Sequence, residues 1–206
     1  FDGFETAGPG FINFFLGSKF YSAVVNSVLE NPETYGNSDF GKGEKVMVEF
    51  VSANPTGPMH MGNARGGALG DCLAAVLDKA GYNVWREFYV NDAGNQIEKF
   101  GCSLEARYLQ IFKGDEIEFP EDGYQGADIT ELAQEYADIN GDSLVNVSAE
   151  ERKKALVDFA LPKNISKMQS DMAKYNITYD KWFFESELHK SGAVKAVVDT
   201  LTEKGL

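Results

Sequence analysis

A histidine and an asparagine stand three residues apart in the stretch SANPTGPMHMGNARGG, which runs from residue 52 to residue 67. At the start of a helix, His60 and Asn63 can both direct hydrogen-bond donors at one phosphate group. Gly62, between them, leaves room for a base or a ribose. Fixed donors aimed at developing charge are worth roughly 2.7–4 kcal/mol each. These residue types at this spacing therefore predict a site for a phosphorylated ligand.

The stretch differs from two familiar nucleotide-binding motifs. It contains no Gly-Lys-Ser or Gly-Lys-Thr and is therefore not a P-loop. The glycines at positions 62, 66 and 67, and Gly70 just beyond the stretch, do not follow the Gly-x-Gly-x-x-Gly order of the dinucleotide fingerprint. Another kind of nucleotide-binding turn remains, in which prolines stiffen the loop and glycines let a ligand approach the backbone.

The elements around the stretch predict where it lies in a fold. The short apolar run 46–51 is typical of a strand buried on both faces. A helix is expected over 64–80, with one apolar stripe made by Ala68, Leu69, Cys72, Leu73, Val76 and Leu77. A second strand over 83–90 and a second helix over 95–112 complete a βαβ pattern, which predicts a parallel α/β sheet. The stretch then lies at the carboxyl end of a strand and the amino end of a helix, where such sheets bind ligands and phosphates.

The flanking segments indicate further parts. Residues 11–16 are typical of a strand, and Ser18 is expected to cap a helix over 19–30 that Asn31-Pro32 ends. Residues 35–44 have the composition of a flexible linker. Beyond residue 112 we expect an acidic loop over 114–126 and a helix over 127–139. A capping box of Ser148 and Glu151 then opens a long helical region, interrupted or kinked near Pro162. An aromatic anchor at 182–184 and a last helix over 188–204 follow, so this part is interpreted as a mostly helical insertion.

Composition limits the classes of function. The chain has 206 residues and a net charge of −13, which argues against a general nucleic-acid binder. From residue 114 to 151 there are twelve acidic residues and no lysine or arginine; we interpret this as a solvated face, with a positively charged partner as the alternative. Cys72 and Cys102 form no metal or disulfide pattern and are expected to be small buried residues in a reducing cytoplasm. No apolar run is long enough for a membrane span, and the first residues show neither an initiator methionine nor a signal peptide, so we expect a piece of a longer chain.

Several strings in the sequence resemble one family. HMGN is similar to the His-Ile-Gly-His signature of class I aminoacyl-tRNA synthetases, with Asn63 in place of the second histidine. The longer string VEFVSANPTGPMHMGNARGGALGD closely resembles arginyl-tRNA synthetases. The strings REFYVNDAGNQI, FPEDGYQG and GPGFINFFL extend the resemblance over nearly the whole chain.

The resemblance implies an activity and a domain plan. It implies ATP-dependent ligation of L-arginine to its tRNA through an arginyl-adenylate, with Mg²⁺ accompanying ATP and no protein-bound metal. It implies a cytoplasmic and monomeric parent enzyme. Residues 1–40 would end an N-terminal additional domain, 41–112 would form the first half of a Rossmann-like catalytic domain, and 113–206 would form the connective insertion and the start of the return. The family's lysine-rich second signature and anticodon-binding domain are not recognised here, so the chain alone is expected to be inactive.

The resemblance also implies roles for individual residues. Glu49 is a charge in an apolar strand, and a buried carboxylate needs a partner, either an internal cation or the guanidinium of the substrate. His60 and Asn63 would act in catalysis, and the expected ATP-binding residues are Pro58, His60, Gly62, Asn63 and Gly66. Arginine would be bound by Glu49, Ser52, Asn54 and Gln96. The tRNA or the pocket edge would be contacted by Asn13, Tyr89, Asn91 and Asp92.

Two other readings are compatible with the sequence. The chain could belong to another class I nucleotidyl transferase of the same fold with a different substrate. It could also be a non-catalytic RNA- or protein-binding module derived from such an enzyme. If the substrate is arginine, Glu49→Gln should selectively weaken its binding, which tests the first alternative. A second signature loop downstream in the parent reading frame would favour the enzyme over the binding module.

Overall fold

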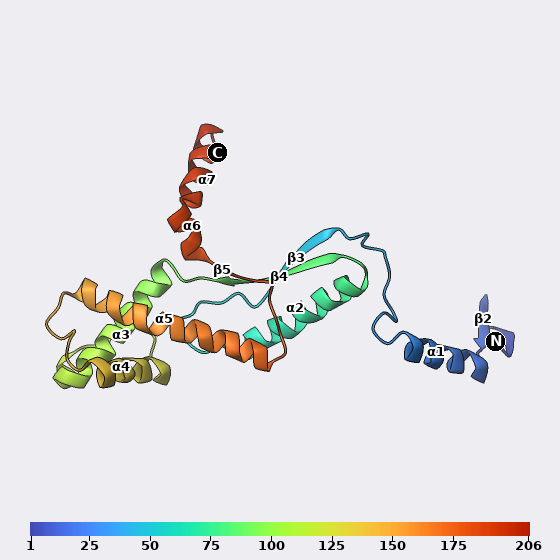
Figure 1. The fold of residues 1–206 in the computed structure, drawn as a ribbon, viewed down its shortest axis with the longest axis horizontal. Helices are drawn as coiled ribbons and strands as arrows, with labels where there is room; N and C mark the ends of the chain where they lie inside the picture. The colour runs from blue at the N-terminus through green and yellow to red at the C-terminus, as the bar shows by residue number, and fades with distance from the viewer. The chain divides into compact units, whose positions relative to one another are not determined.

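The computed structural model describes residues 1–206, apart from the side chain of Asp115. The chain divides into two compact units (Figure 1). One contains residues 1–44 and 77–83, and the other contains residues 45–76 and 84–206.

The first unit begins with an antiparallel hairpin. Strand β1 (Gly3–Ala7) pairs with β2 (Phe11–Phe15), with Gly3 opposite Phe15. Helix α1 (Ser18–Glu30) follows and ends at Asn31, as predicted. The predicted cap is wrong by one residue, because Gly17 is the N-cap and Ser18 lies inside the helix. The carboxyl group of Asp2 occupies the space that a side chain at position 17 would need, so glycine fits this cap.

The predicted linker is an ordered loop within this unit. The backbone N–H groups of Ser38, Gly41 and Gly43 donate to the carbonyls of Lys79, Ala80 and Gly81 over 2.8–2.9 Å. The Lys79 ammonium group donates to the Glu33 carbonyl over 2.8 Å. These bonds hold residues 33–43 against residues 79–81, although the loop is rich in glycine and polar residues.

The second unit is built on a parallel sheet, which confirms the predicted fold class. Its strand order is β3 (Lys45–Glu49), β4 (Asn83–Val90) and β5 (Lys181–Phe184). Strands β4 and β5 run parallel with Glu87 opposite Lys181, and Ala53 forms a parallel bridge with Val90. The sequence identified residues 182–184 only as an aromatic anchor. Trp182 does stack on the buried Phe88 ring, with 4.2 Å between ring centroids, but it does so from a strand.

Strand β3 is more exposed than predicted. Val46 and Val48 are half-buried, whereas Met47 is 58% exposed. The prediction of burial on both faces is wrong because burial alternates along β3, so only one of its faces is covered by the described residues.

Helix α2 (Met61–Lys79) buries a face of small residues. Gly67, Gly70 and Ala74 are buried, whereas the predicted core residues Leu69, Leu73 and Val76 are 72%, 49% and 65% exposed. The Phe50 side chain fills the space beside Gly70 that a Cβ atom would need. The predicted apolar stripe is therefore on the wrong face, because the helix approaches the end of β3 too closely for large side chains.

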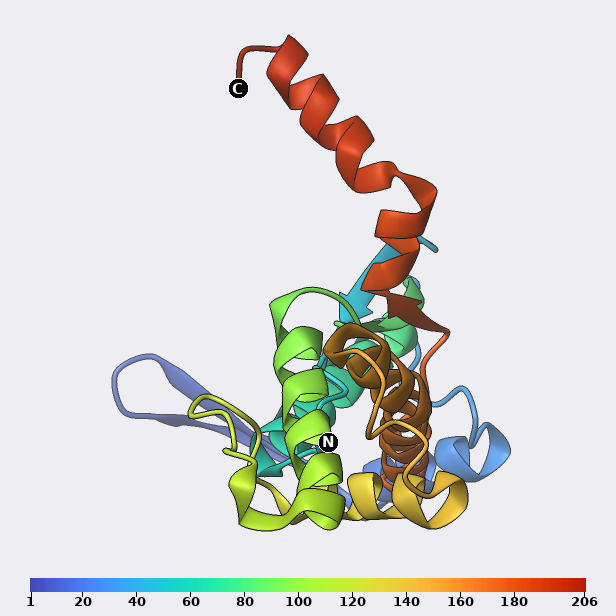
Figure 2. The same ribbon diagram turned by 90° about the vertical axis from the view of Figure 1, so that its left-hand side faces the viewer.

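Three helices of the second unit share one apolar core (Figures 1 and 2). Helix α3 (Asn95–Lys113) packs against α4 (Ala127–Asn140) and α5 (Ala149–Lys174), and a short 3₁₀ turn, η1 (Gly114–Glu116), follows α3. The Ser148 hydroxyl accepts from the Glu151 N–H over 3.2 Å, which confirms the predicted cap. Helix α5 continues through Pro162, so an interruption there is wrong, and the alternative of a kink stays a prediction. Its first half packs in the helical core through Leu156 and its second half against the sheet through Met168, so contacts on both sides of Pro162 hold it as one element.

The end of the chain forms two helices where one was predicted. Helix α6 (Glu185–Ser191) and α7 (Ala193–Glu203) are separated by Gly192, whose φ of 74° ends the first helix. Both cysteines are free, but Cys72 is exposed on α2 and Cys102 is half-buried, so the expectation of burial is wrong for Cys72. Among the described residues, no helix is long and apolar enough to cross a membrane.

Candidate active site

The loop between β3 and α2 begins with two residues in an unusual conformation. Val51 has a φ of 69° and Ser52 a φ of 36°, in a region that costs non-glycine residues about 1–3 kcal/mol each. The Ser52 hydroxyl accepts from the Tyr89 N–H over 3.1 Å, and the next residue bridges to Val90. The end of β4 thus holds the strained turn and fixes the direction in which the loop leaves the sheet.

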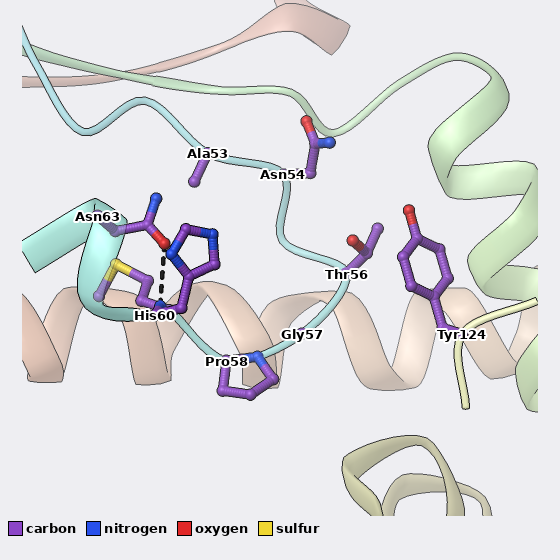
Figure 3. Close-up of a pocket in the computed structure, with 9 residues that line it drawn as sticks. Ala53, Asn54, Thr56, Gly57, Pro58, His60, Asn63 and Tyr124 are labelled. Carbon is purple, nitrogen blue, oxygen red and sulfur yellow. Dashed lines mark hydrogen bonds between the residues drawn. The ribbon is translucent and has the colours of Figure 1, made fainter. Parts of the chain in front are cut away.

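The loop encloses a pocket of about 360 Å³ (Figure 3). Pro55 and Thr56 of the loop are buried, and the Pro55 carbonyl accepts from the Asn164 amide of α5 over 2.9 Å. The lining residues are Ala53, Asn54, Thr56, Gly57, Pro58, Met59, His60, Asn63 and Tyr124. The pocket lies at the carboxyl end of β3, where the βαβ pattern predicted a ligand site.

His60 and Asn63 meet at the first turn of α2. The His60 N–H donates to Asn63 Oδ1 over 3.0 Å, and the Gly62 N–H donates to His60 Nδ1 over 3.1 Å. Both side chains line the pocket beside the amino end of the helix, where the helix dipole is positive. Of the other predicted ATP-binding residues, Pro58 lines the pocket, whereas Gly62 and Gly66 are not among its lining residues.

Glu49 is exposed at the end of β3, so the expectation of a buried carboxylate is wrong. It belongs to the same outward face of the edge strand as Met47. Its Oε1 atom accepts from the Ser52 hydroxyl over 2.7 Å. No cationic side chain of the described residues pairs with it, so the structure does not support an internal ion pair. Glu49 and Ser52 are not among the lining residues of the pocket, whereas Asn54 is.

Tyr124 and Asn164 are site residues that were not singled out from the sequence. The Tyr124 hydroxyl donates to Gln96 Oε1, and its N–H donates to Ser103 Oγ over 2.9 Å. Gln96, predicted to bind arginine, therefore reaches the pocket through Tyr124. The string FPEDGYQG contains Tyr124, but nothing in that string alone indicates that its loop folds back onto α3.

The remaining predicted residues lie elsewhere. Asp92 accepts from the Ser186 N–H and hydroxyl over 2.8 and 2.7 Å, which joins β4 to the first turn of α6. Burial, followed by the neighbouring Glu185 carboxylate, raises the pKa of Tyr89. With its amide nitrogen turned toward Glu185, Asn91 donates to that carboxylate over 2.7 Å. Asn13 belongs to the other compact unit, on β2, where its amide donates to Glu5 over 3.5 Å.

Comparison with known proteins agrees with the geometry. The family model described as tRNA synthetases class I (R), catalytic domain, matches residues 24–142. The Arginine--tRNA ligase of Acetivibrio thermocellus is 59% identical over 205 residues, which are 99% of this chain and 36% of that protein. That of Ruminiclostridium cellulolyticum is 60% identical over 200 residues, 97% of this chain and 36% of that protein. A crystal structure from Campylobacter jejuni, described as an arginyl-tRNA synthetase, aligns with a TM-score of 0.77 and 32% identity over 91% of this chain and 40% of that one.

A parallel sheet whose first strand leads through a histidine-containing turn into a helix N-terminus defines a catalytic fold of the class I tRNA synthetases. Within that class, the chain belongs to the arginyl-tRNA synthetase family. It spans about 36% of the length of the curated relatives that it matches. The resemblance seen in the sequence is thereby confirmed.

Proposed function

We propose that this chain supplies part of the active site for ATP-dependent ligation of L-arginine to tRNA through an arginyl-adenylate. The observation that carries the proposal is the pocket at the amino end of α2, where His60 and Asn63 converge. Mg²⁺ would enter with ATP as part of the substrate. The parent enzyme would act in the cytoplasm as a monomer.

The geometry supports a role for this pocket in phosphate binding. Activation of an amino acid transfers an adenylyl group through a phosphorus centre that gains negative charge, so positioning and electrostatic stabilisation do most of the work. His60, Asn63 and the amino end of α2 would offer donors to one side of that centre. Asn63 can donate a hydrogen bond but cannot carry a positive charge.

The exposed carboxylate of Glu49 supports arginine as the amino acid. A guanidinium presents a planar fork of donors that a carboxylate can match. The Ser52 hydroxyl holds Oε1 of Glu49, and the guanidinium would contact the carboxylate at the exposed end of β3. Ser52 and Asn54 follow at the strand end, where they would hold the amino-acid end of the substrate.

The test is a charging assay on a chimera. The Acetivibrio thermocellus ligase would carry this chain in place of its matching segment, and tRNA charging would be measured with each amino acid in turn. We expect arginine alone to be charged, and His60→Ala to lower the rate by roughly 10²-fold or more. The 206-residue chain by itself is expected to give no charging.

The other outcomes separate the alternatives. Charging of a different amino acid would retain the phosphate-binding role and reject arginine as the substrate. A folded chimera that charges nothing would favour a binding module.

A further inference from the structure

The carboxylate of Glu185 lies where strands β4 and β5 end next to each other and α6 begins. Strand β5 ends at Phe184, opposite Val90 of β4, so Glu185 is the first residue of α6. Asp92 holds the start of this helix, because its two carboxylate oxygens accept from the Ser186 N–H and hydroxyl. The Glu185 side chain, 25% exposed, is thereby held against the residues that follow β4.

Glu185 determines how the amide of Asn91 is turned. One of the two amide atoms that can be nitrogen or oxygen lies 2.7 Å from a Glu185 carboxylate oxygen and 3.2 Å from the Ala93 carbonyl oxygen. Both neighbours are acceptors, so the atom between them must be the nitrogen, which donates to both. A hydrogen bond to a carboxylate is roughly twice as strong as one between neutral groups, so Glu185 is the stronger of the two constraints.

The orientation of Asn91 determines that of Asn54, a residue that lines the pocket. With its nitrogen toward Glu185, Asn91 turns its oxygen to the nearer atom of the Asn54 amide, 3.1 Å away. An amide oxygen only accepts hydrogen bonds, so Asn54 must present its nitrogen to Asn91 and its oxygen on the other side of the planar group. This is the reverse of the Asn54 orientation drawn in Figure 3.

We propose that Glu185 is a positioning residue: acting through Asn91, it turns the amide of Asn54 so that an acceptor oxygen, and not an NH₂ group, is left for the ligand. We call the series Glu185–Asn91–Asn54 the amide relay. Glu185 is not among the lining residues of the pocket, so it acts without touching the ligand. An acceptor oxygen suits an ammonium group. The relay is a property of the chain itself, and only the identity of the ligand as the α-ammonium group of arginine rests on the proposed function.

Glu187 offers a matched control on the same helix. Its carboxylate is half-exposed and pairs with the Lys181 ammonium group of β5 over 3.7 Å. Glu185→Gln keeps the shape of the side chain but offers Asn91 either an oxygen or a nitrogen, so it no longer fixes the direction of the relay. Glu187→Gln makes the same change two residues further along α6.

The first measurement is the scalar coupling across each hydrogen bond of the relay, by NMR of the ¹³C,¹⁵N-labelled chain. We expect one coupling from the Asn91 side-chain nitrogen to the Glu185 carboxyl carbon and another from the Asn54 side-chain nitrogen to the Asn91 amide carbon. Glu185→Gln should weaken the second coupling roughly twofold or more, and Glu187→Gln should leave both unchanged. A coupling in the opposite direction, from the Asn91 nitrogen to the Asn54 amide carbon, would overturn the proposal.

The second measurement is the KM for arginine in the chimera with the Acetivibrio thermocellus ligase. Glu185→Gln should raise this KM roughly fivefold, the effect of one hydrogen bond of ordinary net strength, with little change in kcat or in the KM for ATP. Asn91→Asp should raise it further, because it places a second carboxylate against Glu185. Combining Asn91→Asp with Glu185→Gln should recover most of the loss, since a carboxylate at position 91 can accept from both of its neighbours.

The remaining outcomes separate the relay from the proposed function. A parallel rise of the KM for ATP, or no recovery in the double variant, would show a general loss of structure and overturn the positioning role of Glu185. Couplings in the expected direction in a chain whose chimera charges no arginine would support the relay and count against the proposed function.

Discussion

The Ser52 hydroxyl donates to Glu49 Oε1 over 2.7 Å and at the same time accepts from the Tyr89 N–H over 3.1 Å. A single hydroxyl thus joins the end of β3 to the end of β4. Because Ser52 is held in a left-handed conformation by the strained turn, it can reach back three residues along the chain. The carboxylate is exposed, but one of its oxygens has a fixed partner.

This link predicts that Ser52→Ala weakens arginine binding without touching the phosphate site. Loss of one hydrogen bond of about 1 kcal/mol should raise the KM for arginine roughly fivefold in the chimera. Glu49→Gln should have a larger effect, because it removes the charge that the guanidinium would contact. The KM for ATP serves as the control in both variants, and an equal rise in both KM values would contradict the assignment of Glu49 to arginine.

Tyr124 leads to a second prediction about the pocket. Its ring lines the wall across the pocket from His60, and Gln96 and Ser103 hold its hydroxyl and its N–H (Figure 3). Tyr124→Ala should open this wall and raise the KM for ATP, the substrate proposed for this pocket, about tenfold, which corresponds to ~1.4 kcal/mol. Tyr124→Phe keeps the ring and should stay much closer to the unmodified protein. Equal effects of the two substitutions would show that the hydroxyl, not the wall, is what matters.

Local signals in the sequence predicted much of this fold. Strand β4 has the bounds expected from its apolar run, and α3 and α4 end within one residue of the predicted positions, next to Gly114 and Gly141. The Ser148 cap was also predicted correctly. Each of these features depends on residues close together in the chain, such as a capping side chain or a glycine after a helix.

Apart from the cap at Gly17 and the helix break at Gly192, the failures concern partners that are distant in sequence. The buried face of α2 is set by Phe50, which selects Gly70 over the larger residues beside it. Strand β5 exists because Lys181–Phe184 pairs with β4, and its four residues have no alternation of their own. Likewise, the site loop was predicted from its own residues, whereas Tyr124 and Asn164 join it only through tertiary contacts.

The close approach of α2 to Phe50 predicts opposite effects for two glycine substitutions. Gly70→Ala places a methyl group where the Phe50 ring lies, so it should lower the free energy of unfolding by about 1–3 kcal/mol or more. Gly66→Ala meets open space and should raise it by roughly 0.5–1 kcal/mol, because alanine favours the helix. Urea unfolding followed by circular dichroism measures both. A destabilised Gly66→Ala variant would mean that α2 has neighbours beyond those described.

The hydrogen bonds of Arg152 lead to a prediction about the stability of the core formed by α3, α4 and α5. Its side chain is buried and donates to the carbonyls of Leu144 and Val147 over 2.8 and 2.7 Å and to Glu105 over 2.6 Å. Arg152→Met leaves Glu105 and these carbonyls without a donor and should cost about 3–5 kcal/mol of unfolding free energy. Lys154→Met is the control two residues away: its ion pair with Asp158 is exposed and should contribute at most about 1 kcal/mol. Similar losses in both variants would contradict a special role for Arg152.

The different exposure of Cys72 and Cys102 predicts that their thiols are alkylated at different rates. Burial raises the pKa of the Cys102 thiol, so less of it is thiolate at a given pH, whereas Cys72 is exposed on α2. Because the thiolate is the nucleophile, iodoacetamide should modify Cys72 at least several-fold faster at pH 8, as followed by peptide mass spectrometry. The Cys102 rate should keep rising at pH values above its usual titration range. Cys72→Ser should leave one slow site and Cys102→Ser one fast site; a Cys102 rate equal to that of Cys72 would mean that α3 does not shield its thiol as described.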